Sequence, residues 1–232
     1  MCISGDVSES RKRRWAQLNP ILENNRKANS NQRADGSKSS GYSYVNWEQV
    51  KTIFPIRLGS IESVNSSTIT ESRLDALVSY LNYASICFGS ITEGLEAKRV
   101  HFIAPVIIMV CSLFNGDIQI LAEEDVDGNR VHAHGHFEFV LKRGGKRLCI
   151  IEAKKDDILQ GKVQSLVGCE SLCDVDNLSI AYGVATNYFE WCFLKNSADE
   201  VVEEMLTLSL LNNQPTAESV RIIANKICSI LS

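Results

Sequence analysis

The chain has 232 residues, of which 44% are hydrophobic, and its formal net charge at pH 7 is −4. This length and apolar content are enough for one domain with a substantial core. The acidic balance excludes a protein coated with positive charge, so any contact with nucleic acid must come from a local basic face.

The N-terminal segment is rich in Ser, Asn, Lys and Arg and poor in apolar residues, which predicts a flexible polar tail over residues 1–45. Residues 46–232 are then expected to form a single domain. A basic run within the tail is compatible with a nuclear import signal, a phosphate-binding arm or simple solvation. It consists of Arg11, Lys12, Arg13 and Arg14. The N-terminus lacks the apolar region of a cleavable signal peptide, although a chain whose leader had been removed would look the same.

Two helices are predicted next, after a mixed apolar segment at 47–61. Apolar residues recur at intervals of three and four from residue 70 to 81. A second helix is expected from 93 to 114 and ends at Asn115-Gly116. Its apolar run, 100–114, is too short to span a bilayer, so we predict a buried helix and no membrane partner.

The hydrophobic period then changes to that of strands. Strands are expected at 117–122, 135–141 and 147–153, with a Gly144-Gly145 turn between the last two. A helix at 156–173 and strands at 179–186 and 190–195 follow, and the apolar 179–186 strand is expected to be central. Helices at 198–211 and 215–231 would close the chain. This order predicts a mixed sheet flanked by helices, with its core at 93–195 and C-terminal helices within 198–231.

The eight cysteines are scattered through apolar segments without metal-binding or redox spacing. They are expected to be reduced core residues, and Cys169 and Cys173, one helical turn apart, to pack together. This cysteine use is typical of a cytosolic or nuclear protein.

Charged residues stand at the ends of the predicted central strands. Glu152 and Lys154 alternate with apolar residues and therefore share one face of their strand. Glu138 lies on the preceding strand. A two-residue turn would pair Glu138 with Ile151 and put the two carboxylates on opposite faces. If the two carboxylates act together, the loop must contain an odd number of residues, or a β-bulge must correct the register. We predict that one of these two conditions is met.

Two adjacent carboxylates repel, and a hard divalent cation would compensate them. Mg²⁺, or Mn²⁺ in its place, would take oxygen ligands from Glu138 and Glu152 and from the backbone carbonyl of Ala153. Lys154 would stabilise a hydroxide and the negative charge that develops on a phosphate. The arrangement predicts metal-assisted phosphodiester hydrolysis.

Glu138, thirteen intervening residues and Glu152-Ala153-Lys154 together resemble the PD-(D/E)xK nuclease superfamily, which contains restriction enzymes and repair exonucleases. The resemblance implies a restriction-endonuclease-like αβββαβ core and a nucleic-acid substrate, with DNA favoured over RNA. It also implies that Glu96 helps to bind the metal and that Glu96 and Gln164 orient water or substrate. The superfamily usually has Pro-Asp where this chain has Phe137-Glu138, so a degenerate fold that binds without cleaving is the alternative.

LEAKRVHFIAPVI (95–107) is similar to the helix that precedes the core in stand-alone eukaryotic members, including the nuclease-like domains of crinkler effectors from oomycetes and fungi. DDILQGKVQSL (156–166) resembles the superfamily's helix after the ExK strand, and AYGVATNYFEWCFL (181–194) resembles the strands that complete its sheet. This resemblance implies an effector that a pathogen or symbiont secretes into a host cell, where it acts in the nucleus or cytoplasm.

Each candidate residue has a simpler interpretation. Basic side chains around the hairpin and after the last motif residue could track a nucleic-acid backbone or be solvated; they are Lys142, Arg143, Lys146, Arg147 and Lys155. Glu96 could be a helix N-terminal charge, or Glu93 could replace it, and Gln164 could simply be solvated, with Gln160 one turn earlier on the same face. The alternating histidines at 132, 134 and 136 are expected to be a polar strand edge. Assembly through Leu206, Leu210 and Leu211 is a third hypothesis, and a homodimer is compatible with it.

Overall fold

The computed structural model describes residues 7–29, 40–61, 67–91 and 93–232. A seven-stranded sheet with the order β2-β9-β8-β7-β6-β5-β3 lies at its centre. The pairs β6–β7 and β2–β9 are parallel and the other neighbours are antiparallel, so the predicted mixed sheet is confirmed. The strands are β2 (Ile56–Leu58), β3 (Ile118–Asp125), β5 (His136–Arg143), β6 (Lys146–Ala153), β7 (Ala181–Thr186), β8 (Glu190–Asn196) and β9 (Val201–Thr207).

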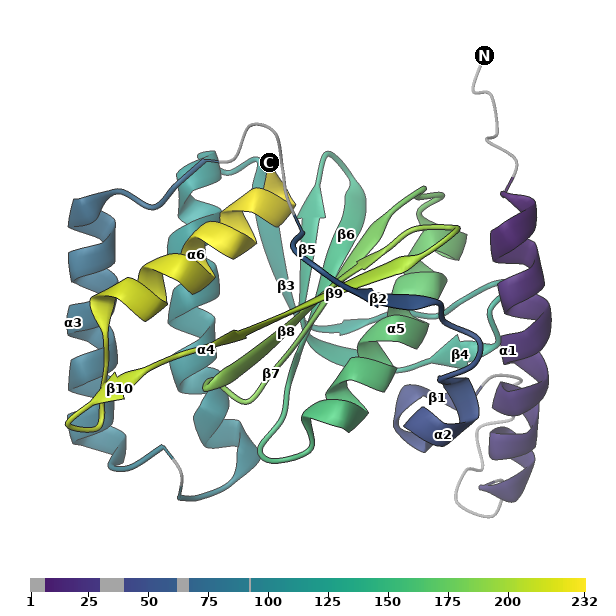
Figure 1. The fold of residues 1–232 in the computed structure, drawn as a ribbon, viewed down its shortest axis with the longest axis horizontal. Coiled ribbons are helices and arrows are strands. Elements are labelled where there is room, and N and C mark those ends of the chain that lie inside the picture. The colour runs from purple at the N-terminus through teal and green to yellow at the C-terminus, as the bar shows by residue number, and fades with distance from the viewer. Residues whose placement is uncertain (1–6, 30–39, 62–66, 92) are drawn as a thin grey trace.

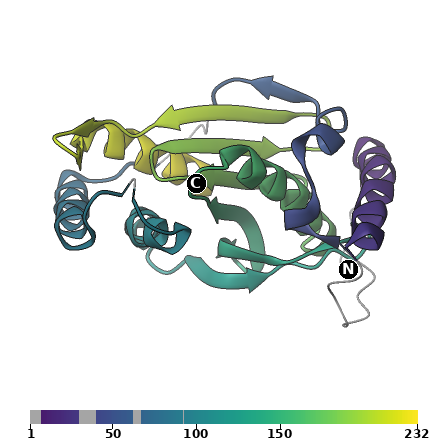
Figure 2. The same cartoon turned by 90° about the horizontal axis from the view of Figure 1, so that it is seen from below.

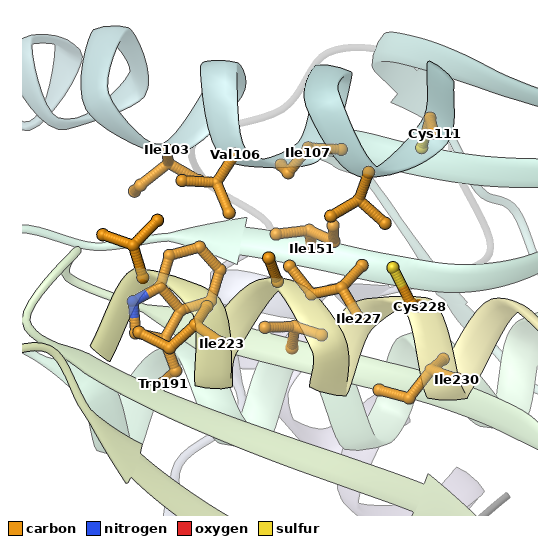
Figure 3. Packing of buried hydrophobic residues seen from close by; sticks show 14 of the residues in the cluster. Ile103, Val106, Ile107, Cys111, Ile151, Trp191, Ile223, Ile227, Cys228 and Ile230 are labelled. Atoms are coloured by element: carbon orange, nitrogen blue, oxygen red, sulfur yellow. The ribbon is translucent and has the colours of Figure 1, made fainter. Parts of the chain in front are cut away.

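One face of the sheet is covered by α4 (Glu96–Cys111) and α6 (Ala217–Leu231) (Figure 1). Helix α3 (Glu71–Phe88) packs against these two helices. Figure 3 shows Ile107 of α4, Ile151 of β6 and Ile227 of α6 within the same buried cluster. Burying these aliphatic side chains supplies the main favourable free energy of this layer.

Helix α4 and the 3-10 turn η3 (Ser112–Phe114) form the most apolar helical stretch of the described chain. Glu96–Phe114 is long and apolar enough to cross a membrane by length and composition. Phe102, Ile103 and Val106 of α4 are nevertheless fully buried against the sheet and α6. Helix α4 therefore has the packing of a core helix, as predicted.

The other face is covered by α5 (Ile158–Val175), with α2 (Trp47–Val50) beside it. Gly168 allows α5 to lie directly on the sheet, because a Cβ atom there would be 2.4 Å from Cζ of Phe137 and 2.7 Å from Cδ1 of Ile150. The α5 layer is therefore tightly fitted over β5 and β6.

The predicted N-terminal tail is wrong for residues 9–28, which form helix α1 (Glu9–Ala28). Trp15, Leu18 and Leu22 are buried at helical spacing and pack into the core on the α5 side. Helix α1 and α3 lie at opposite ends of the molecule (Figure 1 and Figure 2). The domain therefore includes most of the segment before residue 46.

The basic run also differs from the expectation of an exposed import signal. Arg11 and Arg14 are buried and form ion pairs with the buried carboxylate of Glu170. Lys12 and Arg13 lie on the accessible side of α1. Two of the four cations thus hold α1 to the domain and are unavailable for recognition in this folded state.

The predicted helix at 198–211 is wrong as well. Residues 201–207 form β9, which pairs with β8 on one side and β2 on the other. Leu206 is half-buried in β9, whereas Leu210 and Leu211 form the short exposed strand β10 (Leu210–Leu211), which pairs with β11 (Gln214–Pro215). The leucines proposed for assembly therefore lie on strands and not on a helix.

Short elements connect the layers: η2 (Tyr42–Tyr44), and β1 (Ser40–Gly41) paired in parallel with β4 (Ala133–His134). Of the cysteines in the described part of the chain, Cys111, Cys149, Cys169, Cys173, Cys192 and Cys228 are free and buried, as predicted. Cys87 is free but exposed, contrary to the expectation that it lies in the core.

Candidate active site

The β5–β6 hairpin determines which charged side chains meet. Gly144 and Gly145 form a two-residue turn with positive φ angles of 54° and 89°, which glycine adopts without strain. The turn pairs Arg143 with Lys146. Continued without change, this register would place Glu138 opposite Ile151.

A bulge corrects the register, as the sequence predicted. Lys142 pairs with Arg147, but Leu141 pairs with Cys149, so β6 contains one extra residue at this point. Beyond the bulge Phe139 pairs with Ile151. The next residues along the two strands are Glu138 and Glu152, which therefore share one face.

Glu152 is 3% exposed and lies on the face of β6 that α5 covers. Its Oε1 is 2.6 Å from Nζ of Lys154, whereas its Oε2 is buried without a hydrogen-bond partner among the described residues. Burial and the neighbouring charge of Glu138 raise the pKa of Glu152 to about 9, although Lys154 opposes the shift. The site therefore has less positive charge than its carboxylates require.

Helix α4 contributes a third carboxylate through its first residue, Glu96. One oxygen of Glu96 accepts a hydrogen bond from the backbone N–H of Lys155 at 3.1 Å, and the other is 3.9 Å from Nζ of Lys154. Burial lowers the pKa of Lys154, but the surrounding carboxylates, led by Glu152, outweigh it and raise the pKa overall. Glu93, the alternative, is exposed before the helix begins.

The remaining predicted residues lie on β5, β6 and α5. Oε2 of Glu138 accepts a hydrogen bond from the N–H of Ala153 at 3.2 Å. Gln164 is 8% exposed, and its Oε1 has no partner among the described residues. Gln160, about one turn earlier, donates instead to the carbonyl of Val45 at 3.0 Å.

Gly161 brings α5 against these side chains. A Cβ atom at this position would be 3.0 Å from Cγ of Lys154 and 3.8 Å from Cγ of Glu152. Gln164 lies three residues further along α5, on the same side of the helix. The absence of a side chain at Gly161 thus gives Lys154 the room for its ion pair with Glu152.

The donors fit a hard divalent cation in part. Glu152 and Glu96 lie 2.6 Å and 3.9 Å from Nζ of Lys154, Glu138 accepts a hydrogen bond from the N–H of Ala153, and an unpaired buried oxygen of Glu152 is available as a ligand. Within the described ranges, however, no three His, Cys, Asp or Glu side chains are already gathered in a metal-binding arrangement. A cation would therefore be held mainly by Glu138, Glu152 and the carbonyl of Ala153.

The predicted basic face at the hairpin is not beside this site. Lys142, Arg143, Lys146 and Arg147 lie at the turn end of β5 and β6, and the carboxylates lie at the other end, about 13–17 Å away at the usual rise of a strand. Arg143 pairs with Asp117 at 2.8 Å and Arg147 with Asp176 at 2.9 Å. Of the five basic residues predicted to contact nucleic acid, only Lys155, which is partly exposed, lies next to the site.

The alternating histidines are not gathered around a metal. His132 lies 3.3 Å from Glu23 and His136 lies 2.7 Å from Asp125, so two of them face different acidic partners. They do not share the expected strand edge, because His134 lies on β4, His136 lies on β5 and His132 precedes β4.

Arg99 was missed by the sequence interpretation. It lies on α4 one turn after Glu96, is 4% exposed, and donates from Nη1 to the carbonyl of Asn187 at 2.8 Å. The backbone carbonyl of Thr186, the residue before Asn187, accepts a hydrogen bond from the N–H of Lys154 at 2.8 Å. The spacing Glu96-x-x-Arg99 was the available signal, since residues three apart on a helix share a face.

Comparison with known proteins gives one informative match. The chain is 44% identical over 223 residues to crinkler effector protein 5 of Phytophthora infestans. The alignment covers 96% of this chain and 62% of that relative, so the chain spans less than two thirds of the relative's length. No protein-family model and no solved structure matches the chain.

Proposed function

We propose, from the 44% identity to a crinkler effector and from the site geometry, that this chain is the nuclease-like part of a crinkler-type effector. It would be delivered by a pathogen or symbiont into a host cell and act on nucleic acid there, with DNA as the favoured substrate and the nucleus or cytoplasm as the place of action. The reaction would be hydrolysis of phosphodiester bonds.

The observation that carries this proposal is the bulge-corrected register, which brings Glu138 to the same face as the Glu152–Lys154 pair. β-Bulges are common beside active sites, where they move the following side chains to the other face of the strand. Burial of Glu152 with an unpaired oxygen is costly unless a ligand compensates for it.

Each residue has a role in the proposed reaction. Mg²⁺ or Mn²⁺, held by Glu138, Glu152 and the carbonyl of Ala153, would supply positive charge to the phosphate. Lys154 would stabilise an attacking hydroxide through its Nζ protons, and Glu152 keeps that group in place at 2.6 Å. Glu96 fixes the chain after Lys154 through the N–H of Lys155, and Gln164 would orient water or substrate.

Nicking of supercoiled plasmid tests the proposal directly. Wild-type protein is expected to cut in Mg²⁺ or Mn²⁺ and not in EDTA, and Glu152→Gln and Lys154→Met are expected to reduce cutting at least a hundredfold. Glu204→Gln and Lys226→Met are matched controls, because Glu204 and Lys226 form a comparably buried 2.9 Å pair outside the site. Equal cutting by site and control variants would refute the assignment.

A second candidate is a binding module that does not cleave. It is favoured by the hydrogen bond from Ala153 to Glu138 and by the close Glu152–Lys154 pair, which together satisfy part of the site without a metal. This function predicts metal-independent binding of nucleic acid that survives Lys154→Met, with no nicking in any metal.

A further inference from the structure

We propose that Arg99 is an anion-binding residue of the candidate active site and contacts a phosphate group of the nucleic acid. The inference rests on the proposed function and adds to it a specific cation on α4. It starts from the contrast between Arg99 and the other buried arginines of the described chain.

Arg99 is buried without a counter-ion. Its Nη1 donates to the carbonyl of Asn187, and its guanidinium lies 5.3 Å from the centre of the Phe189 ring. Neither group carries a full negative charge. No carboxylate of the described residues lies within ion-pair distance of Arg99, and the solvated carboxylate of Asp156 acts on it only through space.

Arg11 and Arg14 show what the same fold does with a buried guanidinium elsewhere. They are 3% and 4% exposed, as buried as Arg99, and both pair with Glu170, which is fully buried. Removing a charge from water costs several kcal/mol, so an unpaired buried charge is rarely kept without a purpose. An anionic ligand would give Arg99 the counter-ion that Glu170 gives the other two.

The position of Arg99 points to the site at the end of β6. Glu96, three residues earlier on α4, contacts both Lys154 and the N–H of Lys155. On the other side, Arg99 binds the carbonyl of Asn187 while the adjacent carbonyl of Thr186 binds the N–H of Lys154. Two independent connections therefore hold Arg99 beside the residues proposed for catalysis.

The chemistry of the guanidinium suits a phosphate. Arginine offers five N–H donors in a planar fork, and one of those of Arg99 is used by Asn187. The remaining donors can form paired hydrogen bonds to two phosphate oxygens. Such a contact also opposes the repulsion that Glu96, Glu138 and Glu152 exert on an anionic substrate.

The test is binding of a fluorescein-labelled 20-base-pair DNA duplex, followed by anisotropy in EDTA at several NaCl concentrations. Arg99→Met is expected to weaken binding about tenfold and to reduce the slope of log K against log salt by about one. Arg99→Lys, which keeps the charge but not the fork, is expected to weaken binding about threefold. Arg57→Met is the control for loss of a positive charge elsewhere on the protein, because Arg57 is exposed and paired with Glu200.

The outcomes separate this inference from the proposed function. Unchanged affinity and slope in folded Arg99→Met would overturn the inference, whether or not the protein cuts DNA. Should Arg99→Met fail to fold, unchanged binding by Arg99→Lys would overturn it instead. Binding that depends on Arg99 in a protein that never cuts would support the inference and refute the nuclease. No duplex binding by the wild type in EDTA would overturn the inference, while plasmid nicking in Mg²⁺ would still decide the proposed function.

Discussion

Arg14 and Glu170, 156 residues apart in the chain, form a buried ion pair with 2.5 Å between Nη1 and Oε1. Glu170 also accepts hydrogen bonds from Trp15 and Asn196 and pairs with Arg11. One carboxylate thus neutralises two buried guanidinium groups and joins α1 to α5. Its charge is a condition for docking of the N-terminal helix.

Replacing that carboxylate is expected to be severe. Glu170→Gln should lower the free energy of unfolding by about 3–5 kcal/mol, because it leaves two buried guanidinium groups without a counter-ion. Urea unfolding followed by circular dichroism measures the change. Glu200→Gln, which breaks an exposed pair with Arg57, is the control and should cost less than about 1 kcal/mol. Equal effects of the two changes would contradict the role given to Glu170.

The pH dependence of stability should report on Glu152. Because its pKa in the folded protein is about 9, above the ordinary 4.5, its contribution to stability is complete below about pH 4.5 and is lost as the pH rises toward 9. We expect metal-free wild-type protein to lose at least about 1 kcal/mol more than Glu152→Gln between pH 5 and pH 9. Urea unfolding in EDTA across this range checks it, and parallel pH profiles would show that Glu152 ionises normally.

Metal binding should compete with the same proton. Mg²⁺ or Mn²⁺ is expected to raise the melting temperature more at pH 8 than at pH 6, because a cation displaces the proton from Glu152. Differential scanning fluorimetry measures the shift. Glu138→Gln and Glu152→Gln should abolish it, while Glu204→Gln should keep it. A shift that persists in both site variants would place the metal elsewhere.

Two glycines of α5 should separate activity from stability. In Gly161→Ala the new methyl group would crowd Lys154, so nicking should fall at least tenfold while stability changes by less than about 1 kcal/mol. In Gly168→Ala it would overlap Phe137 and Ile150, so stability should fall by about 1–3 kcal/mol. Urea unfolding and plasmid nicking of both variants test this, and a reversal of the two patterns would contradict it.

Periodicity alone predicted the elements around the site. Helices α3, α4 and α5 have apolar residues at helical spacing, and β7 is the continuous apolar strand expected at the centre. The need to bring Glu138 and Glu152 together predicted either an odd-numbered loop or a bulge, and the structure has the bulge, between Leu141 and Lys142. The expected cooperation of the two carboxylates thus predicted a feature of the hairpin that strand propensity does not indicate.

The errors arise where distant partners determine the structure. In β9, Glu203 and Glu204 are good helix formers, but they are held by Lys162 and Lys226 from other elements. Helix α1 was missed because a basic, polar sequence is typical of a solvated tail. The buried partner of its two arginines, Glu170, lies far along the chain and could not be identified from the sequence. Trp15, Leu18 and Leu22, at helical spacing, were the local signal that could have identified the helix.

The connection between the two ends of the chain has a consequence for synthesis. Residues 11 and 14 of α1 bond to carbonyls at 178 and 196–198, and β2 pairs with β9 at Val201. These partners leave the ribosome long after the N-terminal segment does, so neither α1 nor β2 has a surface to dock on until most of the chain has been made. Until then the growing chain must keep this segment free of wrong contacts.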